Sequence, residues 1–193
     1  MLSNLEKYKI VLGSASPRRK ELLTGLDLDF EVRVMEGIKE SYPKDLRPDL
    51  IPVFIAAKKA KAYKKIMPED ELLITADTIV WTYKEVLGKP ADRDAAIEML
   101  KQLSGNEHQV ITGVCLTSKQ KSLSFSQTSS VTFGELTDEE IEYYVDKYQP
   151  FDKAGAYGVQ EWIGYIGVES VKGSFYNVMG LPVRRLYQEL KNF

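Results

Sequence analysis

The sequence contains one cysteine, Cys115, and one histidine, His108, and this scarcity argues against several kinds of site. A lone cysteine cannot form an internal disulfide bond, so the chain suits a reducing compartment, and we predict a cytoplasmic protein. A structural zinc site needs more cysteine and histidine ligands than the chain contains. A Ser-His-Asp hydrolase is not expected either, because no acidic pattern places His108 beside a serine.

Long apolar runs and an excess of one charge are also missing. No apolar run approaches the length of a membrane span, and residues 1–9 are too charged for a secretory signal peptide. The 26 basic and 28 acidic residues give a net charge of -2, which argues against a general nucleic-acid or membrane-surface binder. The chain has neither a P-loop sequence nor a G-x-G-x-x-G after its first expected strand, so two common nucleotide sites are not supported.

The residues that are present have the composition of an ordinary globular protein, 44% hydrophobic and 28% charged over 193 residues. This length suits one large domain or two small ones. The patterns predict strands at residues 8–13, 29–34 and 71–76, hairpins at 79–87 and 108–133, and a strand or hairpin at 163–171. They predict helices at 17–24, 49–66, 92–103, 137–147 and 181–191, of which the fourth opens with a capping box of Thr137 and Glu140. Helices alternate with strands early in the chain and hairpins fill its middle, so we expect an α/β fold with a mixed sheet.

The stretch GSASPRR at residues 13–19 joins the first expected strand to the first expected helix. Ser16 is a good N-cap, and Pro17 suits the first helical position, where its missing N–H costs nothing. The unpaired backbone N–H groups and the positive end of the helix dipole would then lie beside two hydroxyls and two arginines. This pattern fits a phosphate site and, equally, an ordinary strand-to-helix turn with solvated arginines.

Several other charged residues stand at strand ends or in turns that contain glycine. Asp77 follows an apolar strand, Lys89 lies in a Gly-Lys-Pro turn, residues 152–158 combine opposite charges with two glycines, and a Gly-Ser turn occupies residues 173–174. Taken one at a time, each is also explained as a surface turn or an exposed side chain. Together, oxygen ligands and cations without histidine or thiol chemistry indicate a magnesium-assisted phosphate site.

These motifs, in this order, resemble the Maf family of nucleoside triphosphate pyrophosphatases. The resemblance is carried by GSASPRR at residues 13–19, ADT at 76–78, GKP at 88–90, DKAGAYGVQ at 152–160, GS at 173–174 and NVMGLP at 177–182. It implies a homodimer in which residues 1–193 form a single domain. The implied fold is α/β, with an elongated, bent mixed sheet flanked by helices and two lobes around a nucleotide cleft, similar to the inosine triphosphate pyrophosphatases.

The resemblance also implies a reaction and the residues that perform it. A nucleoside triphosphate is hydrolysed between its α and β phosphates to a monophosphate and pyrophosphate, with a divalent cation, Mg²⁺ or Mn²⁺. Asp77 matches the general base, with metal ligation as the alternative, and Glu40 matches a metal-associated glutamate. Lys39 departs from the pattern, since an acidic residue commonly precedes that glutamate. The positions that match phosphate-binding residues are Ser14, Ser16, Arg18, Arg19, Lys59, Lys89, Lys153 and Ser174.

Substrate choice is implied by the same resemblance. Arg18, Thr78 and Gln160 resemble the branch of the family that acts on dTTP and UTP, and a threonine hydroxyl and a glutamine amide suit the imide edge of thymine or uracil. Glu161 and Trp162 stand where a glycine is usual, and the indole could stack on the base or narrow the pocket. Three alternatives stay open: modified pyrimidine triphosphates as substrates, the 7-methyl-GTP branch, and a regulator of septum formation that binds nucleotides or nucleic acid without catalysis.

Overall fold

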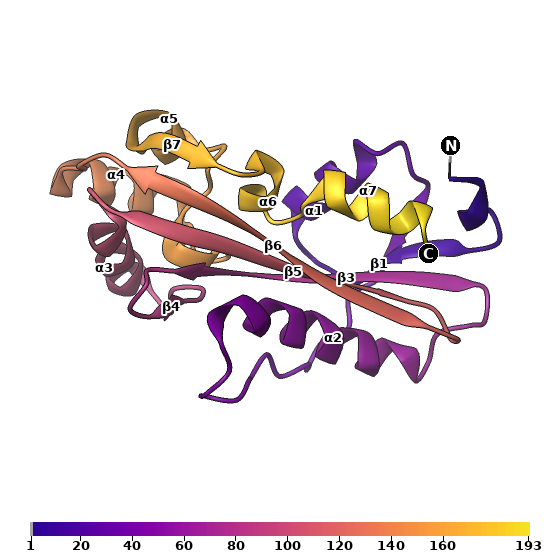
Figure 1. Cartoon of the computed structure of the whole chain (residues 1–193). Coiled ribbons are helices and arrows are strands. Elements are labelled where there is room, and N and C mark those ends of the chain that lie inside the picture. Colours follow the sequence, from indigo (N-terminus) through magenta and orange to yellow (C-terminus); the bar gives the residue numbers. More distant parts are fainter. Residues whose placement is uncertain (1) are drawn as a thin grey trace. The chain divides into compact units, whose positions relative to one another are not determined.

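A computed structural model describes residues 2–193, which form a mixed seven-stranded β-sheet flanked by helices (Figure 1). The strand order is β2-β1-β3-β5-β6-β7, and β4 pairs with β3. The strands are β1 (Lys9–Leu12), β2 (Phe30–Val32), β3 (Glu71–Trp81), β4 (Val86–Leu87), β5 (Glu107–Thr117), β6 (Ser122–Phe133) and β7 (Val168–Lys172). The α-helices are α1 (Pro17–Thr24), α2 (Ile51–Lys64), α3 (Arg93–Leu103), α4 (Asp138–Tyr148), α5 (Trp162–Gly167), α6 (Phe175–Met179) and α7 (Val183–Lys191), and the 3-10 helices are η1 (Ser3–Leu5), η2 (Pro48–Leu50) and η3 (Ala154–Ala156). The predicted α/β fold with a mixed sheet is confirmed.

Contacts within the chain divide it into two compact units. Unit 1 contains the chain up to Asp77 together with Thr112–Gln127 and Gly180–Phe193, and unit 2 contains Thr78–Ile111 and Thr128–Met179. Three of the four boundaries fall within β3, β5 and β6, so each of these long strands has residues in both units, and the fourth follows the end of α6. In the part of the chain that the structure describes, none of the helices has the length and apolar character of a membrane span.

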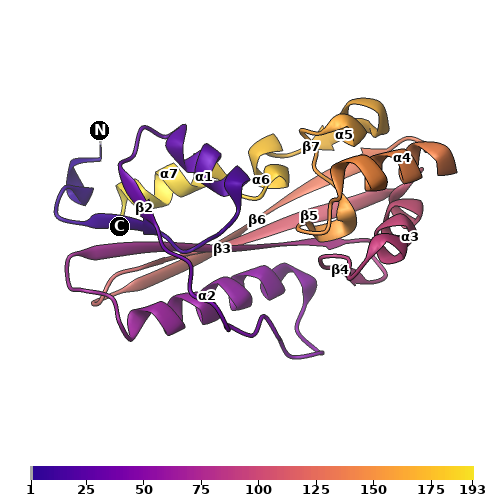
Figure 2. The ribbon, with the colours of Figure 1, turned by 180° about the vertical axis from the view of Figure 1, so that it is seen from behind.

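In unit 1, β1 pairs in parallel with both β2 and β3. Helix α2 covers one face of this part of the sheet, and α1 and α7 cover the other (Figure 2). Thr75 Oγ1 on β3 donates a hydrogen bond of 2.8 Å to the carbonyl of Ala56 on α2. A Cβ atom on Gly113 would lie 2.2 Å from the backbone nitrogen of Val53, so α2 approaches β5 more closely there than any side chain would allow. These two contacts fix α2 on the sheet.

In unit 2, β4 pairs antiparallel with the end of β3, and β7 pairs antiparallel with β6. His108, Phe133 and Tyr157 form a buried cluster with ring centroids 4.9 to 5.5 Å apart. The Nε2 atom of His108 lies 2.7 Å from the hydroxyl of Tyr157. The cluster therefore attaches the loop between α4 and α5, which carries Tyr157, to strands β5 and β6.

Predictions that rest on local helix chemistry are confirmed. Helix α1 begins at Pro17 behind the N-cap Ser16, and α3 begins behind Asp92, whose side chain accepts a backbone hydrogen bond. Helix α4 opens with a capping box formed by Thr137 and Glu140. Each of these starts is determined by a side chain that satisfies an otherwise unpaired backbone N–H, so a few neighbouring residues suffice to predict it.

Two strand predictions are partly wrong. The strand or hairpin predicted at residues 163–171 is a strand only from Val168 onward, as β7, and its first half lies in α5. The absence of a side chain at Gly164 lets α5 approach the preceding loop. A Cβ atom there would lie 1.9 Å from the carbonyl oxygen of Val159. The strand predicted to end before Asp77 continues through it to Trp81 as β3. The short helix α6 was not predicted.

Candidate active site

The turn at residues 13–19 joins β1 to α1 as predicted. The Ser16 hydroxyl oxygen caps α1 by accepting a hydrogen bond of 3.4 Å from the backbone N–H of Arg19. The Ser14 hydroxyl oxygen accepts one from the backbone N–H of Ser16 and one from Nη1 of Arg19, both at 3.3 Å. Two hydroxyls, a helix N-terminus and an arginine therefore lie together in this turn, and this combination suits an anion.

Arg19 also ties the turn to two other segments of unit 1. Its Nε donates to the carbonyl of Gly180 at 2.8 Å, and its Nη1 donates to the carbonyl of Ala76 at 2.9 Å. Burial lowers the pKa of Arg19, the charge of half-buried Arg18 lowers that pKa as well, and the carboxylate of Asp77 raises it. Because Ala76 precedes Asp77 on β3, these bonds hold the turn close to Asp77.

Three predicted residues, Lys59, Asp77 and Glu40, come together in unit 1, and we call them the Lys59 group. The Nζ atom of Lys59 lies 2.9 Å from Oδ1 of Asp77 and 2.8 Å from Oε1 of Glu40. The side chains of Lys59 and Asp77 are 14% and 12% exposed, whereas that of Glu40 is 46% exposed. Burial raises the pKa of Asp77, although Lys59 and Arg19 act against this rise. The group thus contains a buried carboxylate with an increased affinity for a proton.

The oxygen donors of the Lys59 group fit a hard divalent cation that also binds substrate. Asp77 and Glu40 both contact one ammonium group, so their two carboxylates are placed to share a positive charge. Among residues 2–193, no cluster of three histidine, cysteine, aspartate or glutamate side chains is arranged to hold a metal ion. Mg²⁺ commonly binds one or two carboxylates and completes its shell with waters and substrate phosphates. The residues present therefore fit a cation that is bound jointly with a triphosphate.

A second lysine cluster, the Lys153 group, consists of Lys153, Asp152, Glu161 and Tyr144 in unit 2. The Nζ atom of Lys153 lies 2.7 Å from Oδ1 of Asp152 and 3.2 Å from Oε1 of Glu161, and the lysine side chain is 8% exposed. The Tyr144 hydroxyl donates to Oε2 of Glu161 and accepts a hydrogen bond of 3.1 Å from the backbone N–H of Gly158. The predicted phosphate ligand Lys153 is therefore held in one orientation.

The residues predicted to choose the base lie on β3, on α1 and at the end of the loop before α5. Thr78 is half buried on β3. Within residues 2–193 the buried Oε1 atom of Gln160 has no hydrogen-bond partner, and such an acceptor is destabilising unless water or a ligand donates to it. The indole of Trp162 packs edge-on against Tyr143, with ring centroids 4.8 Å apart. Stacking of that indole on a base stays a prediction.

Lys89 and Ser174 belong to turns of unit 2. Lys89 is exposed, and the carbonyl of the preceding glycine accepts a hydrogen bond of 3.0 Å from Gly155 in the loop of the Lys153 group. The Ser174 hydroxyl oxygen accepts a hydrogen bond from the N–H of Asn177 at 3.2 Å, and the N–H of Ser174 donates to Ser129 Oγ at 3.0 Å. The hydroxyl of Ser174 thus contacts the first turn of α6, and its phosphate-binding role stays a prediction.

The structure gathers the predicted residues into two sets, one in each unit. Unit 1 contains the turn at residues 13–19 and the Lys59 group, and unit 2 contains the Lys153 group with Thr78, Lys89, Gln160 and Ser174.

Sequence reasoning missed Tyr144, which contacts both Glu161 and a loop backbone. In a sequence, a tyrosine at a buried position of a helix resembles any other core residue, so nothing around Tyr144 indicates that its hydroxyl forms these bonds.

Comparisons with known proteins agree with the motif resemblance. The family model described as Maf-like protein matches residues 9–193. A protein named dTTP/UTP pyrophosphatase from Parabacteroides distasonis is 65% identical over 193 residues, which is 100% of both chains. A protein of the same name from Bacteroides thetaiotaomicron is 62% identical over 99% of both chains. Another, from Flavobacterium psychrophilum, is 50% identical over 97% of this chain and 95% of the relative. A solved structure of a nucleoside-triphosphatase / dITP/XTP pyrophosphatase from Mycobacterium abscessus covers 95% of each chain at 11% identity with a TM-score of 0.42, a similarity too low to carry a conclusion.

Proposed function

The chain belongs to the Maf family, and on that basis we propose that it is a nucleoside triphosphate pyrophosphatase that hydrolyses dTTP and UTP. The products are the nucleoside monophosphate and pyrophosphate. Relatives that carry this activity in their names align with the chain over nearly its whole length, which supports the substrate class. The single domain and the homodimer that the resemblance implies, and the cytoplasmic location that the composition predicts, are part of the same proposal.

The observation that carries the proposal is the Lys59 group beside the turn at residues 13–19. Asp77 is a buried carboxylate whose raised pKa makes it a better proton acceptor than an exposed aspartate. Arg19 of the turn bonds to the carbonyl of Ala76, directly before Asp77. A proton acceptor and an anion-binding turn are thus neighbours within unit 1, as hydrolysis of a phosphoanhydride requires.

In the proposed reaction Asp77 accepts a proton from the attacking water, with metal ligation as its alternative role. The water oxygen forms a bond to the α phosphorus while the bond from that phosphorus to the bridging oxygen breaks, and pyrophosphate leaves with the electron pair. Ser14, Ser16 and the backbone N–H groups of the turn hold phosphate oxygens, and arginine and lysine side chains offset the developing charge. The proposed cationic and hydroxyl phosphate ligands elsewhere are Lys59, Lys89, Lys153 and Ser174.

A divalent cation, Mg²⁺ or Mn²⁺, is part of the proposal. Asp77 and Glu40 would hold it together with substrate oxygens. When bound, such a cation neutralises charge on the phosphates and lowers the pKa of bound water. Lys39 places a positive charge next to Glu40 in the sequence, so we expect weaker cation binding than in family members with an acidic residue at that position.

Gln160 supports thymine and uracil as the preferred bases. Its buried Oε1 atom lacks a donor within residues 2–193, and the imide N–H of these two bases is a donor. Cytosine has an unprotonated ring nitrogen at the same position and would leave the amide oxygen unpaired. Thr78 and Arg18 are proposed to recognise the adjoining carbonyl oxygens. Modified pyrimidines that keep the imide edge satisfy the same contacts.

The test is pyrophosphate release from dTTP, UTP, CTP, the purine triphosphates and 7-methyl-GTP, each with Mg²⁺ or Mn²⁺. We expect kcat/KM for dTTP and UTP to exceed that for CTP by at least about tenfold, because a hydrogen-bonding site rejects an analogue that lacks the donor. A tenfold preference for 7-methyl-GTP would assign the chain to the other branch of the family. Binding of nucleotides without pyrophosphate release from any of them would favour the non-catalytic regulator.

A further inference from the structure

Glu40 lies in a segment without helix or strand, between β2 and η2, and a tyrosine of α2 holds the beginning of that segment. The hydroxyl of Tyr63 donates a hydrogen bond of 2.7 Å to the carbonyl of Arg33 and accepts one of 2.7 Å from the N–H of Met35. Tyr63 is 3% exposed, and its ring belongs to a buried cluster of unit 1 against which Met35 also packs. A single buried hydroxyl therefore satisfies two backbone groups at the beginning of the Glu40 segment.

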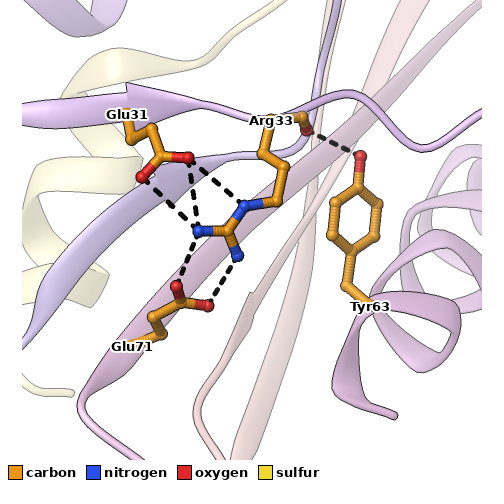
Figure 3. Close-up of polar contacts among 4 residues, drawn as sticks. All are labelled: Glu31, Arg33, Tyr63 and Glu71. Carbon is orange, nitrogen blue, oxygen red and sulfur yellow. Dashed lines mark hydrogen bonds and ion pairs between the residues drawn. The ribbon is translucent and has the colours of Figure 1, made fainter. Parts of the chain in front are cut away.

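Arg33 is fixed from its other side by the sheet. Its guanidinium forms two hydrogen bonds, 2.7 and 2.9 Å long, with the carboxylate of Glu71, the first residue of β3, which is only 4% exposed (Figure 3). Glu31 contacts the same guanidinium at 3.3 Å. The hydrogen bonds with Glu71 raise the pKa of Arg33, so its guanidinium stays charged at any ordinary pH. The chain is thus clamped between β3 and α2 where it leaves β2.

The middle of the segment, at Glu40 and Ser41, is held by the same helix. The Nζ atom of Lys58 donates to both the carbonyl and the hydroxyl oxygen of Ser41 at 3.0 Å, and Lys59 contacts Glu40. Tyr63 follows Lys59 by four residues, so the two lie on one face of α2. The lysine contacts involve exposed partners and are screened by salt, whereas the hydrogen bonds of Tyr63 are buried. The buried bonds therefore provide the more durable restraint.

We propose that Tyr63 is a positioning residue for Glu40: its hydroxyl fixes the segment that places this carboxylate beside Lys59 and Asp77. The inference rests on the proposed function for its catalytic consequence. Glu40 follows Arg33 by seven positions, enough chain to span about 25 Å when extended, so an unanchored segment gives Glu40 many positions far from the Lys59 group. Anchoring at Arg33 and Met35 shortens the free chain before Glu40 to the residues after Met35 and so reduces the number of these positions.

The test is Tyr63→Phe, which keeps the aromatic ring in the core and removes only the hydroxyl. Hydrogen exchange at the Met35 amide and across residues 36–41 should accelerate, because the anchor is lost. The Mn²⁺ concentration for half-maximal activity should rise about tenfold, as is typical when a residue that orients a metal ligand is changed. Mn²⁺ binding measured by electron paramagnetic resonance in the presence of a non-hydrolysable dTTP analogue should weaken to a similar degree.

A double-mutant cycle separates positioning from a general loss of stability. In the Glu40→Gln background, Tyr63→Phe should change kcat/KM by about twofold or less, because a residue that acts through Glu40 has nothing left to position. Tyr157→Phe is the matched control, since it removes another buried tyrosine hydroxyl, that bonded to His108 in unit 2. It should lower the Tm without changing the Mn²⁺ requirement.

Unchanged exchange in the Glu40 segment, or additive losses in the cycle, would overturn the positioning role. A wild-type chain with no pyrophosphatase activity would overturn the proposed function instead, and the exchange and Mn²⁺-binding measurements would still decide the role of Tyr63.

Discussion

Lys59 in unit 1 and Lys153 in unit 2 are both shielded from solvent and both contact two carboxylates, but their partners come from different distances along the chain. Lys59 is held by Asp77 from β3 and by Glu40 from the segment before η2. Lys153 is held by the adjacent Asp152 and by Glu161 in the same loop region. The Lys59 group is thus created by tertiary structure, whereas the Lys153 group is mostly local.

The aspartates of the two groups also differ in how far water reaches them, whereas the glutamates differ in the opposite sense, with Glu40 46% and Glu161 22% exposed. The Asp77 side chain is 12% exposed, whereas that of Asp152 is 54% exposed. Removing one member of a buried pair leaves a charge without compensation, while an exposed partner is replaced by water at little cost. Substitution of Asp77 should therefore have a larger effect than the matched substitution of Asp152. The same order is expected for Glu40 and Glu161 because Glu40 is the proposed cation ligand, and the predictions below test this difference.

The largest effect is expected for Asp77→Asn. An amide does not accept the proton of the attacking water, so kcat should fall about a thousandfold. Asp152→Asn is the matched control and should leave kcat within about threefold of wild type, because Asp152 is half exposed to water and Glu161 still contacts Lys153. Measuring the metal concentration for half-maximal activity in parallel separates the two roles of Asp77: a base changes kcat alone, and a ligand changes both. Near-normal turnover of Asp77→Asn would exclude both the general-base role and the metal-ligand role.

The next largest effect is expected for Arg19→Ala. The change removes hydrogen bonds to the carbonyls of Gly180 and Ala76 and a positive charge from the turn, so turnover of every triphosphate should fall by about a hundredfold. Arg18→Ala should instead alter the ranking of triphosphates, since this residue is proposed to read the base. Steady-state kinetics on the same substrate panel checks both variants. Equal losses on every substrate for both variants would remove the division of roles between the two arginines.

The units should respond to acid in opposite directions. Burial lowers the pKa of His108 from 6.5 to about 4. As the pH falls between these two pKa values, the histidine of the unfolded chain is protonated while that of the folded chain stays neutral, so the free energy of unfolding decreases. The loss between about pH 7.5 and about pH 5 is about 2 kcal/mol. Asp77, whose folded pKa is raised, contributes most stability below its unfolded pKa and loses that contribution as the pH rises through its folded value.

Urea denaturation of wild type and His108→Gln at the two pH values measures the histidine contribution. The variant should lose less stability than wild type on acidification. An identical pH dependence in both proteins would show that His108 does not remain neutral when buried.

The smallest effect is expected for Glu161→Gln. The amide oxygen still accepts the hydrogen bond of Tyr144, and Asp152 still contacts Lys153, so kcat/KM should fall by only about threefold. Glu40→Gln, which likewise removes one carboxylate from a lysine, is the matched variant in unit 1. It should lower kcat/KM further although Glu40 is the more exposed glutamate, because Glu40 is the proposed cation ligand. A greater loss for Glu161→Gln than for Glu40→Gln would reverse the comparison between the two groups.

The sequence was sufficient wherever a few neighbouring residues determine a structure. Ser16 and Pro17 predicted the start of α1, and Thr137 with Glu140 predicted that of α4, because both starts are made by local hydrogen bonds. The family motifs selected Asp77 and the residues now found around it, but no spacing rule placed them together. Their contacts became visible only with the arrangement of α2 against β3.

The failures come from contacts between segments that no local pattern records. The apolar run at 163–171 has strand-like residues, yet Gly164 lies against the carbonyl of Val159, and the run begins as helix α5. Tyr63 and Tyr144 resemble ordinary core residues of helices, and their hydroxyls nevertheless hold the backbone of distant loops. Hydrophobic periodicity predicts which side chains are buried but not which groups they contact. It therefore cannot identify buried hydroxyls that form hydrogen bonds with a remote backbone.

The central claim is that water attacks the α phosphorus of dTTP with Asp77 in place as proton acceptor or metal ligand. Hydrolysis of dTTP in ¹⁸O-labelled water, followed by mass spectrometry of both products, tests this claim most directly. The account predicts that the label appears in the thymidine monophosphate and that the released pyrophosphate is unlabelled. Label in pyrophosphate, or in inorganic phosphate released beside thymidine diphosphate, would contradict it.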